Sequence, residues 1–304
     1  METPLPNFLV IGAGKAGTSS LYFYLRQHPQ VFMSSIKETN FFVYDSQNPT
    51  SPRQESSKQF PIRSLEAYRA LFQEAVGARA IGEASVWYLV DPGAAERIRH
   101  HLPGAKLVAI LRDPAERAFS AYSMYVRDGL EPRTFAQAIA DEEHGTWDHA
   151  LPDAQKSYVS DGYYARHLQV YFDLFERSQI AVYLFEDLQA DARTLLGRLY
   201  GFLGVDDSFD PDTGRRHNPS GLPRNPLLRP LVHKRSMLTT TMRRVLPDRL
   251  RHHARAAQNA LRDRYAQAAP PLPPESRAML IVRYRDDIIE LQDLIRRDLR
   301  HWLL

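Results

Sequence analysis

The chain has 304 residues, of which 43% are hydrophobic, and its 39 Lys and Arg against 36 Asp and Glu leave a net charge of +3. This is the composition of a folded globular protein, and it excludes a disordered or fibrous chain. The absence of cysteine excludes disulfides, thiolate zinc sites, iron–sulfur clusters and a cysteine nucleophile.

Predicted strands and helices alternate along the chain. A short apolar run over 8–12 is typical of a strand buried on both faces, and a glycine loop joins it to a helix that begins at residue 18. Such an alternation indicates an α/β fold with a P-loop-like core, in which helices flank a central parallel β-sheet. Further strands are predicted over 80–83, 106–111 and 180–185, and further helices over 64–75, 94–101, 115–126, 163–175 and 192–203.

The remaining segments are predicted as loops and C-terminal helices. Loops are expected over 45–63, 144–159 and 206–226, and a last helix over 275–302 follows a proline-rich break. We expect one domain over 1–304, with a C-terminal helical extension from about 227. No apolar run reaches the length of a membrane span, and residues 1–6 lack the features of a secretory signal, so a cytoplasmic location is expected.

The segment from Gly12 to Ser20 is predicted to bind an anion. A glycine loop between a buried strand and a helix exposes backbone N–H groups, and the helix N-terminus adds the positive end of its dipole. Lys15 supplies a full charge, and Thr18, Ser19 and Ser20 supply hydroxyl donors. The alternative is a plain turn followed by a Ser/Thr helix cap.

Two common nucleotide-binding patterns fit this loop incompletely. The P-loop of nucleoside triphosphatases requires a lysine directly after its second glycine, whereas Thr18 follows Gly17 here. Gly12, Gly14 and Gly17 match the dinucleotide fingerprint, but no acidic ribose ligand is evident about 20 residues further on. A nucleotide kinase or other NTPase therefore stays an alternative, with Asp113 as its magnesium-binding acid.

A resemblance to a known family rests on several motifs. Gly12-Ala-Gly-Lys-Ala-Gly-Thr-Ser-Ser-Leu21 resembles the 5′-phosphosulfate loop of sulfotransferases that use 3′-phosphoadenylyl sulfate (PAPS), and Leu111-Arg-Asp-Pro-Ala-Glu-Arg-Ala-Phe-Ser120 resembles their 3′-phosphate motif. Lys37-Glu-Thr-Asn-Phe-Phe42 and Gly82-Glu-Ala-Ser-Val-Trp-Tyr-Leu89 are similar to segments of the heparan-sulfate branch. The chain is thereby identified as a bacterial-type member of the PAPS-dependent sulfotransferases.

The resemblance implies PAPS as co-substrate and no metal. Lys15 would neutralise the charge that builds on the 5′-phosphate as the S–O bond breaks, which is where preorganised charge helps most. An arginine suits the 3′-phosphate because its guanidinium donates two parallel hydrogen bonds. The implied donor-binding residues are Lys15, Ala16, Gly17, Thr18, Ser19 and Ser20 at the 5′-phosphate, Arg112 and Ser120 at the 3′-phosphate, and Asn218 and Ser220 in a loop over the adenosine.

The resemblance makes Glu83 the general base that takes the proton of the acceptor hydroxyl. It lies at the end of a predicted strand, where open α/β sheets carry their ligands. The apolar Ile81 and Trp87 are expected to raise its pKa towards neutrality by desolvation. The alternative for Glu83 is a solvated glutamate at a strand end.

Other residues and the acceptor are less closely defined. Lys37 is predicted to contact the sulfuryl group or the acceptor, and His167 and His217 are alternative bases. Animal heparan-sulfate enzymes often carry a lysine after the catalytic glutamate, and Ala84 stands there instead, which argues against a strongly anionic glycan. The predicted reaction is sulfuryl transfer to a hydroxyl of a carbohydrate, lipid or secondary metabolite, and a relative that binds nucleotide without catalysis is the non-enzyme alternative.

The C-terminal part of the chain is basic. Residues 211–304 hold 19 Lys and Arg against 9 Asp and Glu. A solvated arginine-rich helix face is the ordinary interpretation, and peripheral contact with a membrane surface or with an anionic acceptor is the alternative. Because the whole chain has a weak net charge, no nucleic acid is expected as a partner.

Overall fold

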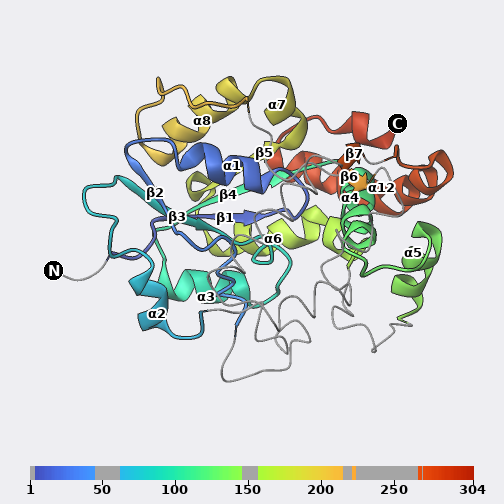
Figure 1. Ribbon diagram of the computed structural model, residues 1–304, viewed down its shortest axis with the longest axis horizontal. Coiled ribbons are helices and arrows are strands. Elements are labelled where there is room, and N and C mark those ends of the chain that lie inside the picture. The colour runs from blue at the N-terminus through green and yellow to red at the C-terminus, as the bar shows by residue number, and fades with distance from the viewer. Residues whose placement is uncertain (1–3, 45–61, 146–156, 215–220, 224–265, 269) are drawn as a thin grey trace. The chain divides into compact units, whose positions relative to one another are not determined.

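The computed structural model describes residues 4–44, 62–145, 157–214, 221–223, 266–268 and 270–304 (Figure 1). The chain divides into two compact units. The first comprises 1–114, 163–217 and 284–304, and the second comprises 115–162 and 218–283. The prediction of one domain over the whole chain stays a prediction.

The first unit is built on a five-stranded sheet in which every pairing is parallel. Its strand order is β2-β3-β1-β4-β5, so β1 occupies the centre, and all five residues of β1 are buried. The strands are β1 (Phe8–Gly12), β2 (Val31–Met33), β3 (Ala80–Ala84), β4 (Lys106–Leu111) and β5 (Ile180–Leu184). The predicted class, a parallel sheet flanked by helices, is confirmed.

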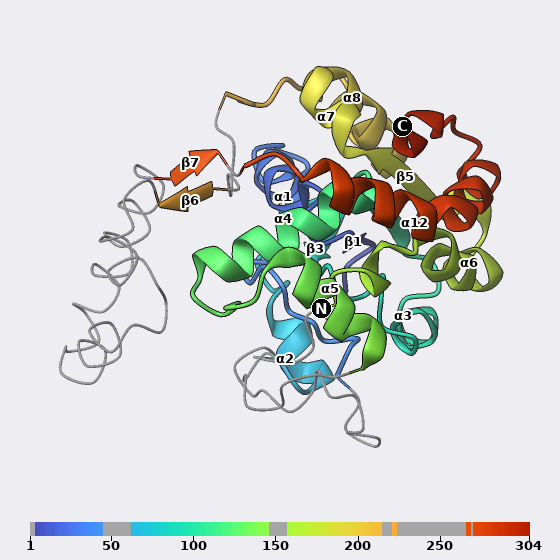
Figure 2. The same ribbon diagram turned by 90° about the vertical axis from the view of Figure 1, so that its right-hand side faces the viewer.

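Helices cover both faces of this sheet. On one face lie α1 (Thr18–Leu25), α7 (Phe185–Ala190) and α8 (Ala192–Leu203), and on the other lie α2 (Leu65–Ala70), α3 (Ala94–His101) and α6 (Tyr164–Leu174) (Figures 1 and 2). Alternate residues of a strand face opposite sides. The fully buried Phe8 and Val10 therefore pack with α1 and α8, whereas Leu9 and Ile11 face the other layer.

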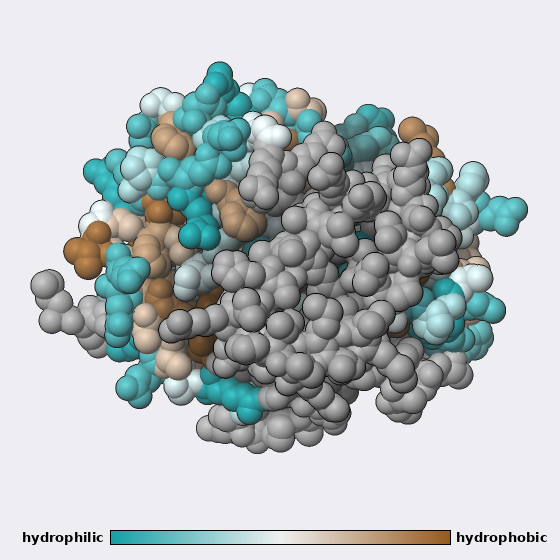
Figure 3. All heavy atoms as spheres, in the orientation of Figure 1, coloured by the Kyte–Doolittle hydropathy of each residue, from teal (hydrophilic) through white to brown (hydrophobic). Residues whose placement is uncertain are grey.

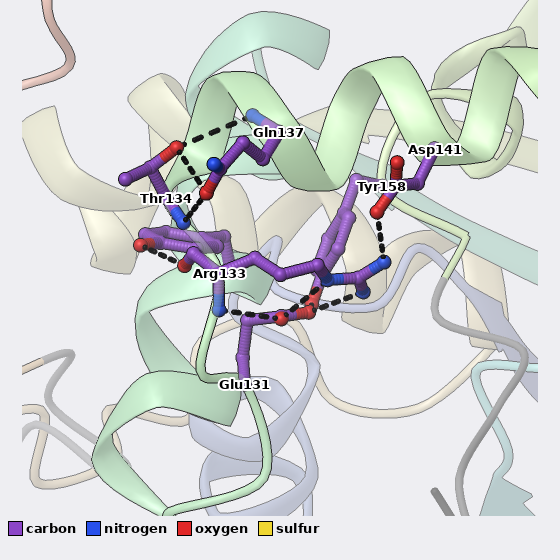
Figure 4. A network of polar contacts seen from close by, with 7 residues as sticks. Glu131, Arg133, Thr134, Gln137, Asp141 and Tyr158 are labelled. Carbon is purple, nitrogen blue, oxygen red and sulfur yellow. Dashed lines mark hydrogen bonds and ion pairs between the residues drawn. The ribbon is translucent and has the colours of Figure 1, made fainter. Parts of the chain in front are cut away.

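The second unit contains a buried polar network (Figure 4). The fully buried side chain of Glu131 accepts hydrogen bonds from Arg133 Nε and Nη2, both at 2.8 Å, and from the Tyr158 hydroxyl at 2.7 Å. Arg133 also contacts Asp141 at 2.7 Å. The network therefore connects the segments on both sides of the helix α5 (Phe135–His144) to that helix. The elements of this part of the chain are α4 (Pro114–Arg127), α5 (Phe135–His144), η2 (Ser160–Gly162), β6 (Gly221–Pro223) and β7 (Ala266–Ala268).

Several predicted boundaries are wrong. The helix expected over 64–75 ends at Ala70, because the hydrogen bonds that follow span three residues instead of four. The last helix, α12 (Pro274–Ile295), stops before Trp302, since Arg296 adopts a left-handed φ of 55°, and a 3-10 turn, η5 (Arg300–Leu303), follows. β6 lies within the predicted 206–226 loop, and β7 lies where helix was expected, because each strand exists only through its antiparallel pairing with the other.

Several short elements were not predicted from the sequence: β2, α5, η2, α7 and a short 3-10 turn, η3 (Arg177–Gln179). α5 has a readable signal, because Thr134 and Gln137 form a reciprocal capping box at its start. β2 has only three residues and is stabilised by its pairing with β3.

Among the described residues, no helix is long and apolar enough to cross a membrane. On the face shown in Figure 3, hydrophilic residues cover much of the described surface, and most of the visible apolar residues lie in the left half of the view.

Candidate active site

Three predicted site segments follow three neighbouring strands of the first unit. The glycine loop follows β1, Glu83 is the next-to-last residue of β3, and Arg112 directly follows β4. β1 lies between β3 and β4, and the carboxyl ends of parallel strands share one edge of the sheet. The structure thus brings the anion loop, the carboxylate and the arginine to the same edge.

The path of the glycine loop is fixed by close packing. A Cβ atom at Gly12 would lie 2.8 Å from Leu89 Cβ, and one at Gly17 would lie 2.8 Å from Phe185 Cδ2. Gly17 also has a φ of 91°, so both spacing and backbone conformation require glycine there. Lys15 lies between them with a left-handed φ of 71°, which a lysine adopts only when its surroundings hold it there.

The first turn of α1 has the features of an anion site. No side chain caps this helix, its N-cap is Gly17, and no acidic residue lies in the first turn. Backbone N–H groups at a helix start have no partner within the helix and carry the positive end of its dipole. The predicted binding residues Thr18, Ser19 and Ser20 form this turn, and Thr18 is buried.

Arg112 is held by contacts from β5–α7 and from α6. Its guanidinium carbon lies 5.1 Å from the centroid of the Phe185 ring, and its backbone carbonyl accepts a hydrogen bond from the Tyr164 hydroxyl at 3.0 Å. The same Phe185 ring packs where a Cβ of Gly17 would lie. One aromatic side chain therefore supports both the glycine loop and Arg112, a role that the sequence analysis did not identify.

Glu83 is fully buried, and its carboxylate is surrounded by hydroxyl groups. Tyr88 donates to Oε1 at 2.5 Å, Tyr68 donates to Oε1 at 3.2 Å, and Ser85 donates to Oε2 at 2.8 Å. Burial raises the pKa of Glu83, and these hydrogen bonds, with one from Thr39, oppose the rise. The predicted rise in the pKa of Glu83 is confirmed in direction. The groups that contact the carboxylate are hydroxyls, whereas the sequence suggested the apolar side chains of Ile81 and Trp87.

Lys37 lies in a loop with an unusual backbone. Its Nζ lies 3.0 Å from Glu38 Oε1, and Glu38 and Asn40 have left-handed φ angles of 57° and 50°. Neither residue is glycine, so the loop stores strain that its contacts must offset. Its predicted role at the sulfuryl group stays a prediction.

The other predicted site residues lie elsewhere. Ser120 is a buried residue of α4 in the second unit, and His167 is a half-buried residue of α6 in the first. Asn218, Ser220 and the alternative base His217 lie outside the described residues, as do the basic helices predicted beyond residue 227 up to 265. Among the described residues, no three His, Asp or Glu side chains gather as a metal site would require.

Several known proteins are similar to this chain in sequence and fold. Residues 6–211 match the sulfotransferase family. The crystal structure of a sulfotransferase from Alicyclobacillus acidocaldarius is 32% identical, with a TM-score of 0.73 over 98% of this chain and 99% of that one. The bifunctional heparan sulfate N-deacetylase/N-sulfotransferase 3 of Mus musculus is 25% identical over 96% of this chain and 30% of its own length. The membrane-associated sulfotransferase kil1 of Dictyostelium discoideum is 36% identical over 40% of this chain and 24% of its own length, so the chain spans less than a third of either curated relative.

Proposed function

The chain belongs to the sulfotransferase family, and from that premise we propose that it transfers a sulfuryl group from PAPS to an acceptor hydroxyl. The observation that carries the proposal is the shared sheet edge. There the glycine loop after β1 lies between β3, whose next-to-last residue is Glu83, and β4, which Arg112 directly follows. A phosphate-binding loop, a buried carboxylate and an arginine are the groups that this reaction uses.

On the donor side, the loop and Arg112 act as anion binders. The backbone amides of Ala16 and Gly17 and the first turn of α1 bind the 5′-phosphate, and Lys15 offsets the charge that develops on it. Arg112 binds the 3′-phosphate, a role supported by its place at the strand end and by the Phe185 ring beneath it. Ser120, Asn218 and Ser220 are assigned to the donor by the sequence motifs alone.

On the acceptor side, Glu83 is the base. The acceptor oxygen attacks sulfur, and its proton passes to the Glu83 carboxylate. The new O–S bond forms as the S–O bond to the 5′-phosphate breaks, which leaves 3′-phosphoadenosine 5′-phosphate. A carboxyl whose pKa is raised by burial is a stronger base than an exposed one, which supports this assignment. Lys37 is proposed to contact the sulfuryl group as it moves.

The acceptor is proposed as a hydroxyl-bearing carbohydrate, lipid or secondary metabolite. A relative named for heparan sulfate N-sulfotransfer makes a glycan amine the second acceptor class to test. Ala84, where animal heparan-sulfate enzymes often carry a lysine, favours a less anionic acceptor. The cytoplasmic location expected from the sequence and the peripheral membrane contact of the basic C-terminal segment stay predictions.

Isothermal titration with 3′-phosphoadenosine 5′-phosphate, without metal, tests the donor site. We expect this bisphosphate to bind and NAD to fail under the same conditions. Titration of ATP with and without magnesium is the control for the NTPase alternative. Binding of ATP only with magnesium, and none of the bisphosphate, would overturn the proposal.

A further inference from the structure

Two hydroxyl groups connect the Glu83 carboxylate to the loop that carries Lys37. Ser85 Oγ donates to Glu83 Oε2 at 2.8 Å and accepts the backbone N–H of Asn40 at 3.0 Å. Tyr88 Oη donates to Glu83 Oε1 at 2.5 Å and accepts the backbone N–H of Phe42 at 3.5 Å. Each hydroxyl is thus shared between the carboxylate and the loop.

All these bonds run in one direction, towards the carboxylate. A hydroxyl that gives its hydrogen to Glu83 accepts from its other partners, as Ser85 does from the N–H of Asn40 and Tyr88 from the N–H of Phe42. Hydrogen bonds aligned in this way polarise and strengthen one another. The loop therefore stabilises the ionised form of Glu83 through Ser85 and Tyr88.

The conformation of the loop depends on the same contacts. Glu38 and Asn40 occupy the left-handed region, which costs a non-glycine residue energy. The backbone N–H of Asn40 donates a hydrogen bond to Ser85 Oγ. Thr39, which lies between Glu38 and Asn40 in the sequence, is fully buried, and its hydroxyl contacts those of Ser85 and Tyr88. These hydroxyls therefore hold the backbone on the C-terminal side of Lys37.

We infer that Ser85 and Tyr88 are positioning residues that join the Glu83 carboxylate to the 37–42 loop, so that the base and Lys37 are held as one polar unit. The inference rests on the proposed function for the roles of Glu83 and Lys37, but the coupling itself is a property of the folded chain. Tyr68, on α2, adds a longer bond of 3.2 Å to the same carboxylate oxygen and does not bridge to the loop in this way.

The surroundings of Glu83 make the coupling measurable. The titratable groups of the described residues that face its carboxyl are Tyr68 from α2 and Tyr88 from the segment after β3. Burial and the Glu83 charge raise the pKa of both phenols well above the ordinary value, so they stay protonated and act as donors. Removal of one donor therefore changes the titration of Glu83 without adding a charge.

The test compares Ser85→Ala and Tyr88→Phe with Tyr200→Phe. Tyr200 is also fully buried, but its hydroxyl has no hydrogen-bond partner among the described residues, so it controls for the loss of a buried phenol oxygen. The Glu83 carboxyl is titrated by NMR in protein labelled with ¹³C-glutamate, its signal being assigned with Glu83→Gln. Hydrogen exchange of the Asn40 and Phe42 amides is measured on the same proteins.

We expect Tyr88→Phe to raise the pKa of Glu83 by about one unit, because a hydrogen bond to its ionised form is lost. Exchange at Asn40 should accelerate about tenfold or more in Ser85→Ala, and exchange at Phe42 should accelerate in Tyr88→Phe, while Tyr200→Phe changes neither. If Ser85 and Tyr88 had only a general structural role, their replacement would accelerate amide exchange throughout the protein and leave the pKa of Glu83 unchanged.

The outcomes separate the inference from the proposed function. If both variants match Tyr200→Phe in titration and exchange, the coupling is overturned, whatever the enzyme transfers. If the coupling is found and wild-type protein binds no 3′-phosphoadenosine 5′-phosphate, the proposed function fails while the coupling stands.

Discussion

The Tyr88 hydroxyl lies 2.5 Å from Oε1 of Glu83, inside a fully buried part of the first unit. Burial destabilises the charged carboxylate, and the hydroxyl stabilises it. Burial is the larger influence, so the pKa of Glu83 is raised despite four hydrogen-bonding hydroxyl side chains. A carboxylate made more basic by burial suits proton abstraction.

Replacement of Glu83 by Gln should abolish most of the transfer and leave donor binding intact. General base catalysis contributes a factor of about 100 to 10,000, and the isosteric amide cannot accept the proton. Turnover with PAPS and calorimetric binding of 3′-phosphoadenosine 5′-phosphate measure the two effects separately. A Glu83→Gln protein that binds normally and transfers at the wild-type rate would remove Glu83 from the role of base.

The same substitution should change how stability depends on pH. With a raised pKa, folded Glu83 binds its proton at pH values where the unfolded chain has lost it, so wild-type stability falls as pH rises through that window. Glu83→Gln lacks this titration. The Tm of the variant minus that of wild type should therefore increase in scanning calorimetry as the pH rises above the ordinary pKa of a glutamate, about 4.3. A difference that stays constant or shrinks contradicts the raised pKa.

Lys15→Ala should lower turnover by a factor of about 100 to 1,000, because a preorganised charge next to the leaving group is lost. Lys15→Arg keeps the charge and serves as the control, with a smaller loss expected from the changed geometry. Steady-state turnover under saturating PAPS measures both. Equal rates for Lys15→Ala and wild type would show that the loop does not bind the leaving group.

Gly17→Ala should destabilise the protein by about 1–3 kcal/mol, because it combines a left-handed φ with a 2.8 Å approach to Phe185. Gly14→Ala is the matched control in the same loop, since the new Cβ would meet Val86 at an ordinary 3.6 Å. Its effect should stay within about 0.5 kcal/mol. Urea unfolding of both variants makes the comparison, and similar losses would show that neither the left-handed φ nor the Phe185 contact requires glycine at position 17.

Arg133→Met should destabilise the second unit by about 3–5 kcal/mol, since it leaves the buried Glu131 carboxylate without its cation. Arg193→Met is the control, because the Arg193–Asp210 ion pair lies on the surface and is screened by water. Thermal unfolding should show a large loss for the first and no measurable change for the second. Equal effects would mean that the network in Figure 4 adds nothing to stability.

Much of the fold follows from local sequence patterns. Apolar runs identified β1 and β4 with their observed bounds, and helical periodicity identified α3 and α8. These elements are long, or buried on both faces, so their own residues determine them. The strands β2, β6 and β7 have three residues each, and each exists because it pairs with a strand that is distant in the sequence. A local sequence pattern holds no information about such a pairing.

The candidate site divides in the same way. The sequence alone determined the glycine loop, Lys15, Arg112 and Glu83, because a loop between strand and helix and a charged residue at a strand end can be recognised locally. Only the tertiary structure decided their surroundings: Phe185 next to Gly17 and Arg112, and hydroxyls around Glu83 that come from as far away in the sequence as Thr39. Ser85 and Tyr88 lie in the same motif as Glu83, but their contacts with its carboxylate, and those of Tyr68 and Phe185, depend on packing and burial that residues distant in the chain create.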